Sequence, residues 1–261
     1  MSPAVCLATC VDMLPTPDTS HVPYERVYEP AEDSFLFLDT LSSESERTWL
    51  RERFANHAPL VVELGTGSGV VIGFVNAHAD TLFGKSSILT AGVDMNAFAC
   101  RATRETVDKA AKENAQGRGT YLCSSMGDLA AAWRPGAIDV LLFNPPYVPT
   151  SEMPSRPGTY ADEAPPGKPS FDDDSYLLSL SYAGGRDGME TTERLMAGLG
   201  DVVSARGCAY ILFCAQNKPE EVKERIRSWS SEWRAETVGS SGKTAGREKL
   251  QIVRIWREHS T

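Results

Sequence analysis

The sequence predicts an α/β protein built on a doubly wound, mainly parallel sheet. Short apolar runs alternate along the chain with longer stretches that have helical periodicity, and a glycine-rich turn, GTGSG, follows the first of those runs. The chain has 261 residues and 41% hydrophobic content, enough for one sizeable core. Alternating strands and helices form parallel sheets that carry helices on both faces.

The expected elements follow one another in a regular order. Residues 1–27 are rich in Pro, Thr and Ser, and we expect a flexible segment there, ahead of a single domain at 28–261. A helix is expected from YEPAEDSFLFLDTL, and a long amphipathic helix from MNAFACRATRETVDKAAKENA. The apolar runs predict six strands: PLVVEL, SSILTAGVD, TYLCS, AIDVLLF, GCAYILFCA and KLQIVRIW.

One stretch between the fourth and fifth expected strands breaks this alternation. Residues 149–175 are dense in Pro and acidic residues and offer little apolar surface to bury. We expect a mobile insertion there and not a second domain. The acidic run Asp172–Asp174 is expected to be a solvated loop and not a metal site, because no His or Cys lies nearby.

Charge and cysteine usage exclude several classes of protein. The formal net charge of −9 argues against a general nucleic-acid binder, which needs clustered Lys and Arg. The six cysteines form no CxxC pair, so neither a metal site nor a disulfide framework is predicted. No apolar run is long enough to span a membrane, and the N-terminus has no basic flank. We expect a cytosolic or nuclear protein.

The glycine turn after the first strand indicates a nucleoside site. Gly65, Gly67 and Gly69 allow a sharp turn, and the helix behind them begins with unpaired N–H groups. A dinucleotide fingerprint, GxGxxG, would place its third glycine at Val70, so the pattern is GxGxG, preceded by Glu63. This spacing favours a nucleoside without a pyrophosphate. On its own, the turn could equally be a tight strand-to-helix connection, and Glu63 a helix cap.

Two further acidic residues stand where a nucleoside would need them. Asp94 ends the second strand, 25 residues past Gly69, and can accept hydrogen bonds from two ribose hydroxyls. Asp128 follows the third strand and can accept a hydrogen bond from an adenine amino group, although it is as readily a helix N-cap.

The stretch FNPPYVPT, residues 143–150, supplies the candidate catalytic residues. Proline cannot donate to a sheet ladder, so the fourth strand must end at about Asn144. The Asn144 side-chain oxygen and the Pro145 backbone carbonyl could accept the two hydrogens of a planar amino group, while the Tyr147 ring packs on its face. A bare NPPY is usually a β-turn, but its position at a strand end beside the glycine turn favours chemistry.

Four motifs in fixed order, YEPAEDS, ELGTGSG, NPPYV and AGGRDG, resemble those of S-adenosylmethionine-dependent methyltransferases that modify planar amino groups. The chain is most similar to the eukaryotic HemK-type protein-glutamine methyltransferases that act on the class I translation termination factor. The resemblance covers residues 25–256 and implies a methyltransferase domain with a seven-stranded sheet whose last strand, KLQIVRIW, is antiparallel. It implies that S-adenosylmethionine is bound by Ser34, Glu63, Gly65, Gly67, Asp94, Asp128, Leu129 and Asn144.

The same resemblance implies a substrate and a partner. The substrate would be the glutamine of the Gly-Gly-Gln motif in the termination factor, presented alone or with the factor's GTPase partner. The partner would be a small zinc-binding activator subunit covering an apolar surface near TYLCS. Two departures, Tyr182 where relatives carry tryptophan and the long insertion, bear on substrate docking. Adenine amines of DNA or RNA, histone lysine, and an inert scaffold remain the alternatives.

Overall fold

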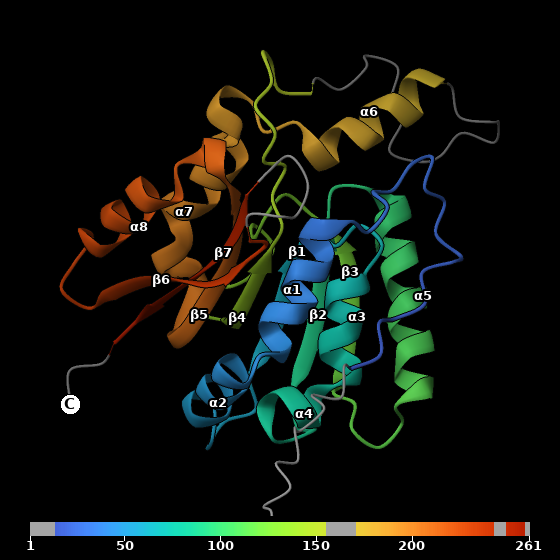
Figure 1. Cartoon of the computed structure of the whole chain (residues 1–261). Helices are drawn as coiled ribbons and strands as arrows, with labels where there is room; N and C mark the ends of the chain where they lie inside the picture. The colour runs from blue at the N-terminus through green and yellow to red at the C-terminus, as the bar shows by residue number, and fades with distance from the viewer. Residues whose placement is uncertain (1–13, 155–170, 243–248, 259–261) are drawn as a thin grey trace, which may run out of the picture.

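A computed structural model describes residues 14–154, 171–242 and 249–258 (Figure 1). Over these residues the chain forms one seven-stranded sheet in the order β3-β2-β1-β4-β5-β7-β6. Neighbouring strands from β3 to β5 are parallel, and β7 is antiparallel to both β5 and β6. The predicted fold class is therefore confirmed. The strands are β1 (Leu60–Leu64), β2 (Leu89–Asp94), β3 (Thr120–Met126), β4 (Ile138–Phe143), β5 (Val203–Cys214), β6 (Trp233–Ser240) and β7 (Leu250–Arg257).

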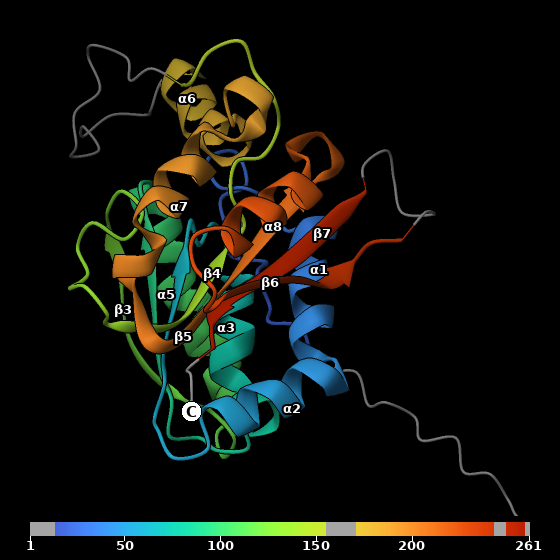
Figure 2. The same cartoon turned by 90° about the vertical axis from the view of Figure 1, so that its left-hand side faces the viewer.

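Helices cover both faces of the sheet, as Figures 1 and 2 show. One face carries α1 (Glu32–Ser42), α2 (Glu44–Arg53), α3 (Val70–Ala77), α4 (Ala79–Phe83) and α5 (Ala97–Glu113). The other carries α7 (Glu190–Val202) and α8 (Pro219–Arg227). The helix α6 (Phe171–Tyr182) crosses above the sheet, and two short 3-10 helices, η1 (Arg186–Gly188) and η2 (Ala215–Asn217), precede α7 and α8.

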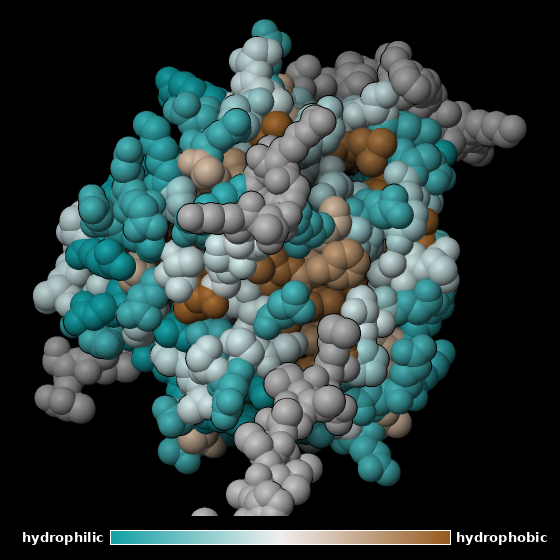
Figure 3. Space-filling model, in the orientation of Figure 1, coloured by the Kyte–Doolittle hydropathy of each residue, from teal (hydrophilic) through white to brown (hydrophobic). Residues whose placement is uncertain are grey.

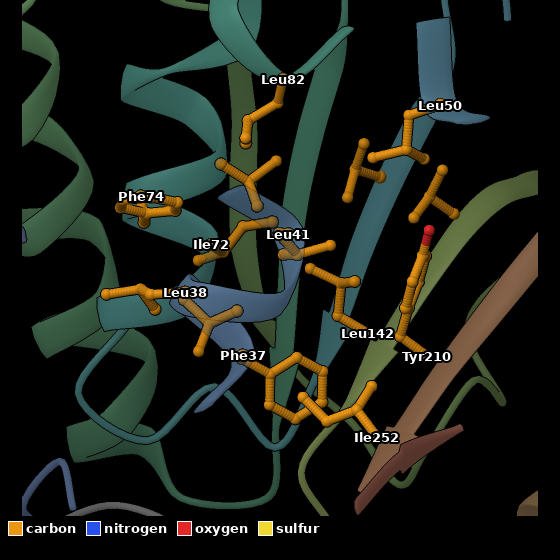
Figure 4. Close-up of a cluster of buried hydrophobic side chains, with 14 of the residues drawn as sticks. Phe37, Leu38, Leu41, Leu50, Ile72, Phe74, Leu82, Leu142, Tyr210 and Ile252 are labelled. Carbon is orange, nitrogen blue, oxygen red and sulfur yellow. The ribbon is translucent and has the colours of Figure 1, made fainter. Parts of the chain in front are cut away.

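The largest hydrophobic core lies under α1 and α3. Figure 4 shows Phe37 and Leu41 of α1 beside Leu142, Tyr210 and Ile252 of the sheet. These side chains are at most 2% exposed. Burial of this kind is worth about 1.5–3 kcal/mol for each large apolar side chain. The core therefore fixes the strands whose ends carry the candidate site.

A buried polar network fastens α2 to the sheet. The Glu46 carboxylate accepts hydrogen bonds from Arg254 Nη1, at 2.6 and 2.7 Å, and from the Tyr210 hydroxyl at 2.8 Å. The Arg254 guanidinium also lies over the rings of Trp49 and Trp256, with 4.1 and 4.6 Å to the centroids. Burial raises the pKa of Tyr210 well above its usual value. An acid, a base and a phenol are thus hydrogen-bonded together inside the core.

The N-terminal segment differs from its prediction where the structure describes it. Val22 and Val27 are buried against Ala99 and Ala102 of α5. The expectation of a flexible segment at 1–27 therefore fails for residues 14–27, because their apolar side chains find a partner surface on α5. Residues 1–13 lie outside the described part of the chain.

The expected insertion at 149–175 is also more ordered at its ends than predicted. The helix α6 begins at Phe171, so the last residues of the expected insertion are helical. Asp174 forms an ion pair with Arg26, and the interpretation of the acidic run as a solvated loop is therefore wrong for this residue. At the other end, Thr150 exchanges hydrogen bonds with Gly185. Residues 155–170 of the expected insertion lie outside the described ranges.

One strand, β6, was not predicted. Its sequence, WRAETVGS, lacks the continuous apolar run that predicted strands such as β1 and β4, and a register shift interrupts its pairing with β7 between Thr237 and Gly239. The strand exists because β7 offers a complete antiparallel partner beside it. Pairing with a neighbour therefore outweighs a weak local pattern.

The surface carries a limited amount of exposed apolar side chain. The face in Figure 3 is hydrophilic at its margins, with hydrophobic residues near its centre and beside α6. At one edge of the sheet, β3 exposes Leu122 by 48% and Met126 by 52%. None of the helices in the described ranges is long and apolar enough to cross a membrane. The same ranges hold no group of His, Cys, Asp or Glu side chains that could bind a metal ion.

Candidate active site

A cavity of about 400 Å³ opens at the carboxyl ends of β1, β2 and β4. The chain crosses from β1 to β2 over one face and reaches β5 from β4 over the other, and open α/β sheets bind ligands at such a switch point. All the residues predicted to bind a cofactor line this one cavity: Ser34, Glu63, Gly65, Gly67, Asp94, Asp128, Leu129 and Asn144.

The glycine turn and Asp94 form one hydrogen-bonded unit. The backbone N–H of Gly67 donates to Asp94 Oδ2 at 2.9 Å, and that of Asn96 donates to Oδ1 at 2.8 Å. Each carboxylate oxygen keeps a lone pair for a ligand hydroxyl. Burial raises the pKa of Asp94, and these backbone donors oppose the shift. The arrangement holds the carboxylate where a ribose diol could bind.

Glu63 lines the cavity and also caps the following helix, the alternative that the sequence left open. It is buried, and its Oε2 accepts a hydrogen bond at 2.9 Å from the N–H of Ile72 in the first turn of α3. Burial raises its pKa well above 4.5. The third glycine of the turn, Gly69, serves helix packing, because a Cβ there would lie 2.5 Å from Thr103 Cα. Because Gly69 has no Cβ, α3 can pack closely against α5.

Asp128 and Leu129, which follow β3, also line the cavity. Asp128 forms an ion pair with Arg194 of α7, and both side chains are about half exposed. Leu129 has φ of 52°, in the left-handed region that a bulky residue rarely adopts. Arg194 also lines the cavity. No sequence signal distinguished it from any other arginine on the polar face of a helix.

The YEPAEDS motif forms a compact polar corner of the cavity. The Tyr28 hydroxyl donates to Asp33 Oδ2 at 3.1 Å, and the Ser34 N–H donates to Asp33 Oδ1 at 2.6 Å. Asp33 and Ser34 are buried. The sequence predicted Ser34 here but missed Asp33, which orients it, and Tyr28, which lines the cavity.

Of the three candidate catalytic residues, the structure brings one to the cavity and leaves the other two outside its lining. Asn144 lines the cavity, and its Oδ1 is buried and accepts no hydrogen bond from any described residue. Pro146 joins it in the lining, whereas Pro145 is buried outside it. The half-buried Tyr147 ring packs against the core under α1 and α3 and also lies outside the lining. Of the three, Asn144 alone is brought to the cavity.

The AGGRDG motif holds the NPPY segment in place. The N–H of Val148 donates to the Tyr182 carbonyl at 3.0 Å, and the N–H of Gly184 donates to the Val148 carbonyl at 2.8 Å. Tyr182 takes part in this hydrogen bond through its backbone carbonyl, so the bond does not depend on whether a tyrosine or a tryptophan stands at this position. Asn217 then joins both segments, because its Nδ2 donates to the carbonyls of Tyr147, at 3.1 Å, and Asp187, at 2.9 Å. A lone asparagine after a strand gave no signal of this role.

We expect Gly188→Ala to impair activity by displacing NPPY. Gly188 has φ of 67°, and a Cβ would lie 1.9 Å from the Tyr147 carbonyl oxygen. Gly136→Ala is the matched control, since Gly136 also has φ of 67° but a Cβ there meets nothing within 4 Å. Both variants should lose about 1–2 kcal/mol of unfolding free energy from backbone strain, and Gly188→Ala should lose more because of its clash with the Tyr147 carbonyl.

Only Gly188→Ala should also lower catalytic activity, by more than about tenfold, because small misplacements are costly in active sites. Steady-state kinetics and urea unfolding of the two variants check this. Equal activity of the two would contradict the assigned packing.

Comparison with known proteins places the chain in a family. No family model matches it. It is 31% identical over 95% of its length to the Schizosaccharomyces pombe protein "eRF1 methyltransferase catalytic subunit mtq2", covering 98% of that protein. It is 30% identical over 93% of its length to Mus musculus "Methyltransferase HEMK2", covering 96%. A Methanocaldococcus jannaschii protein, named provisionally as a protein N5-glutamine methyltransferase, is 29% identical over 90% of this chain and 93% of its own.

Solved structures are more distant. Ribosomal protein L11 methylase from Lactobacillus delbrueckii subsp. bulgaricus shows a TM-score of 0.46 and 15% identity, over 89% of this chain and 82% of that one. The relatives in the preceding paragraph match nearly end to end at about 30% identity. The chain therefore belongs to the HemK-type methyltransferase family that includes mtq2 and HEMK2.

Proposed function

We propose that this enzyme transfers a methyl group from S-adenosylmethionine to the side-chain amide nitrogen of the glutamine in the Gly-Gly-Gln motif of the class I translation termination factor. The observation that carries the proposal is Asn144, which lines the cavity with a buried Oδ1 that has no partner among the described residues. An unsatisfied buried acceptor costs about 1–3 kcal/mol, which a donor on a bound substrate would offset.

The cavity suits S-adenosylmethionine in size and in its polar groups. Its volume of about 400 Å³ falls within the range of small-molecule sites. Asp94 would hold the ribose, the glycine turn would lie against the nucleoside, and Asp128 would face the adenine, with Ser34 and Leu129 completing the pocket. When bound, the cofactor supplies an electrophilic methyl group. Its sulfonium is cationic, so the acids of the pocket favour binding.

Asn144 would act by orienting the substrate nitrogen. An amide nitrogen is a poor nucleophile because its lone pair is delocalised into the carbonyl. An acceptor that takes one of its N–H hydrogens directs the lone pair and stabilises the charge that develops on nitrogen. The Pro145 carbonyl as second acceptor and the Tyr147 ring as a stacking surface stay predictions, since both lie outside the lining as it stands. Fixing the nitrogen near the methyl would remove much of the entropic barrier.

Three considerations favour glutamine over the other amines. The related proteins are named for eRF1 and for N5-glutamine, and the net charge of −9 gives little support for a DNA or RNA substrate. A lysine ammonium must first lose a proton, and NPPY supplies no base. An inert scaffold would have no need of Asp94 and Asn144 in one cavity.

A partner subunit is part of the proposal. The mtq2 protein is named a catalytic subunit, which fits an enzyme that works with a second chain. We propose a small zinc-binding activator that covers the edge strand β3, where Leu122 and Met126 are exposed. An uncovered apolar edge favours aggregation. We further propose a cytosolic or nuclear location, where the termination factor would be met.

The test combines the enzyme, with and without the activator subunit, labelled S-adenosylmethionine, and the termination factor. The substrate carries either Gln or Ala in its Gly-Gly-Gln motif, and mass spectrometry locates the methyl group. We expect label on the glutamine and none on the Ala variant. Cofactor binding without transfer to glutamine, under both conditions, would overturn the proposed substrate.

A further inference from the structure

The helix α6 forms a wall of the cavity that no sequence motif predicted. Tyr176, Leu177 and Leu180 line the same cavity as Asp94 and Asn144. In Figures 1 and 2 the helix lies across the top of the molecule, above the sheet. The position of α6 therefore sets how enclosed a bound ligand would be.

The N-terminal segment forms a second wall of the cavity, where Arg26 belongs to the lining. Its backbone carbonyl accepts a hydrogen bond from Asn96 Nδ2 at 2.7 Å. Its guanidinium lies 4.7 Å from the centroid of the Phe98 ring on α5. Asn96 in turn donates its N–H to Asp94. Arg26 is thus separated by one residue from the carboxylate assigned to the ribose.

One ion pair joins these two walls. Arg26 Nε lies 2.7 Å from Asp174 Oδ1, and the two side chains are 19% and 24% exposed. Fully exposed pairs contribute little, but partial burial strengthens the attraction. Asp174 also lies in the first turn of α6, where the helix dipole favours an acidic side chain.

The other end of α6 is attached to the catalytic segment. The Tyr182 carbonyl accepts the hydrogen bond from Val148, and Ala183 forms a parallel β-bridge with Val148. The helix is therefore attached at both ends. Asp174 joins its first turn to Arg26, and Tyr182 joins its last turn to the segment that follows Asn144.

We propose that Arg26 and Asp174 are positioning residues whose ion pair holds α6 over the cavity and slows release of the cofactor and its product. The inference rests on the proposed function for the identity of the ligand. Breaking the pair should loosen the wall at its Asp174 end, while the Val148 attachment keeps the NPPY segment in place. The effect should therefore appear in cofactor release and affinity and not in the methyl-transfer step.

The experiment measures the dissociation rate of S-adenosylhomocysteine from the full-length protein by surface plasmon resonance. Asp174→Asn keeps the shape of the side chain and removes its charge. We expect its dissociation rate to rise about three- to tenfold, with the single-turnover rate at saturating cofactor unchanged. Asp18→Asn is the control, because Asp18 lies in the N-terminal segment with Arg26 and pairs with Lys109 at 3.3 Å, away from the cavity. It should stay within about twofold of the wild type.

Exchanging the charges separates this role from a general effect on folding. Arg26→Asp and Asp174→Arg should each speed release, and the double variant should return to within about threefold of the wild type. Unchanged release in Asp174→Asn, or a double variant no slower than the single ones, would refute the role of the pair. Failure of the wild type to bind S-adenosylhomocysteine would instead overturn the proposed cofactor, and the inference with it.

Discussion

Replacing Asn144 by Ala is expected to lower kcat for glutamine methylation by about 100- to 1,000-fold, the usual cost of removing a group that stabilises developing charge. The Asn144 amide lines the cavity and has no other protein partner for its Oδ1 among the described residues, so its loss affects the reacting nitrogen directly. Single-turnover transfer to the termination factor measures the rate. Binding of S-adenosylhomocysteine should weaken much less, because Asp94 and the glycine turn remain.

Stability supplies an independent check on the same variant. Since the Oδ1 of Asn144 is an unsatisfied buried acceptor, Asn144→Ala should keep the unfolding free energy within about 1 kcal/mol of the wild type or raise it. Asn114→Ala, at the far end of α5, is the matched control: its Nδ2 donates to the Ala77 carbonyl, so the variant should lose stability but keep full activity. Near-normal kcat in Asn144→Ala would remove the main support for the proposed mechanism.

The second large effect concerns folding. Glu46→Ala should lower the unfolding free energy by about 3–5 kcal/mol, because it removes the buried partner of Arg254 and the acceptor of the Tyr210 hydroxyl. Only the longer, more exposed ion pair of Arg254 with Glu236, at 3.6 Å, would remain. Urea unfolding at neutral pH measures the change.

Glu193→Ala provides the comparison for that experiment. Glu193 and Arg225 lie 2.6 Å apart with both side chains nearly half exposed, so this variant should lose less than about 1 kcal/mol. Similar losses in the two variants would show that burial does not control the contribution of the Glu46 pair. The melting temperature of Glu46→Ala should fall together with its unfolding free energy.

Local chemistry explains which parts of the site could be predicted. Gly67, Asp94 and Asn144 each stand directly at a strand end, and the rule that parallel strands present their carboxyl ends together brings them to one cavity. The strand ends themselves could be predicted because a proline or a glycine turn must interrupt the ladder. No contact between distant segments was needed for these assignments.

Apart from Tyr28 and Asp33, which contact each other only five positions apart, the missed residues depend on contacts between distant parts of the chain. Arg194 reaches Asp128 across 66 positions, and Asn217 reaches Tyr147 across 70. Tyr147 itself follows NPP as predicted, yet its ring finds a better apolar surface in the core than in the cavity. The start of α6 was not predicted, because its run of acidic residues is typical of a loop. The ion pair between Arg26 and Asp174 that accompanies the helix is visible only in the structure. Tertiary partners, absent from any local window, decided each case.

The hydrogen bonds between Thr150 and Gly185 have a consequence for how this enzyme can vary. They clamp together the two ends of an excursion whose end residues are 35 positions apart in the chain, with 3.0 Å between donor and acceptor in each direction. The clamp lies just outside the segment that carries Asn144. The entropic cost of closing such a loop rises only with the logarithm of its length. Residues could therefore be added to or removed from the excursion with little strain on the catalytic segment. The segment between Thr150 and Gly185 could therefore change, in evolution or by design, and alter this side of the cavity without displacing the reaction centre.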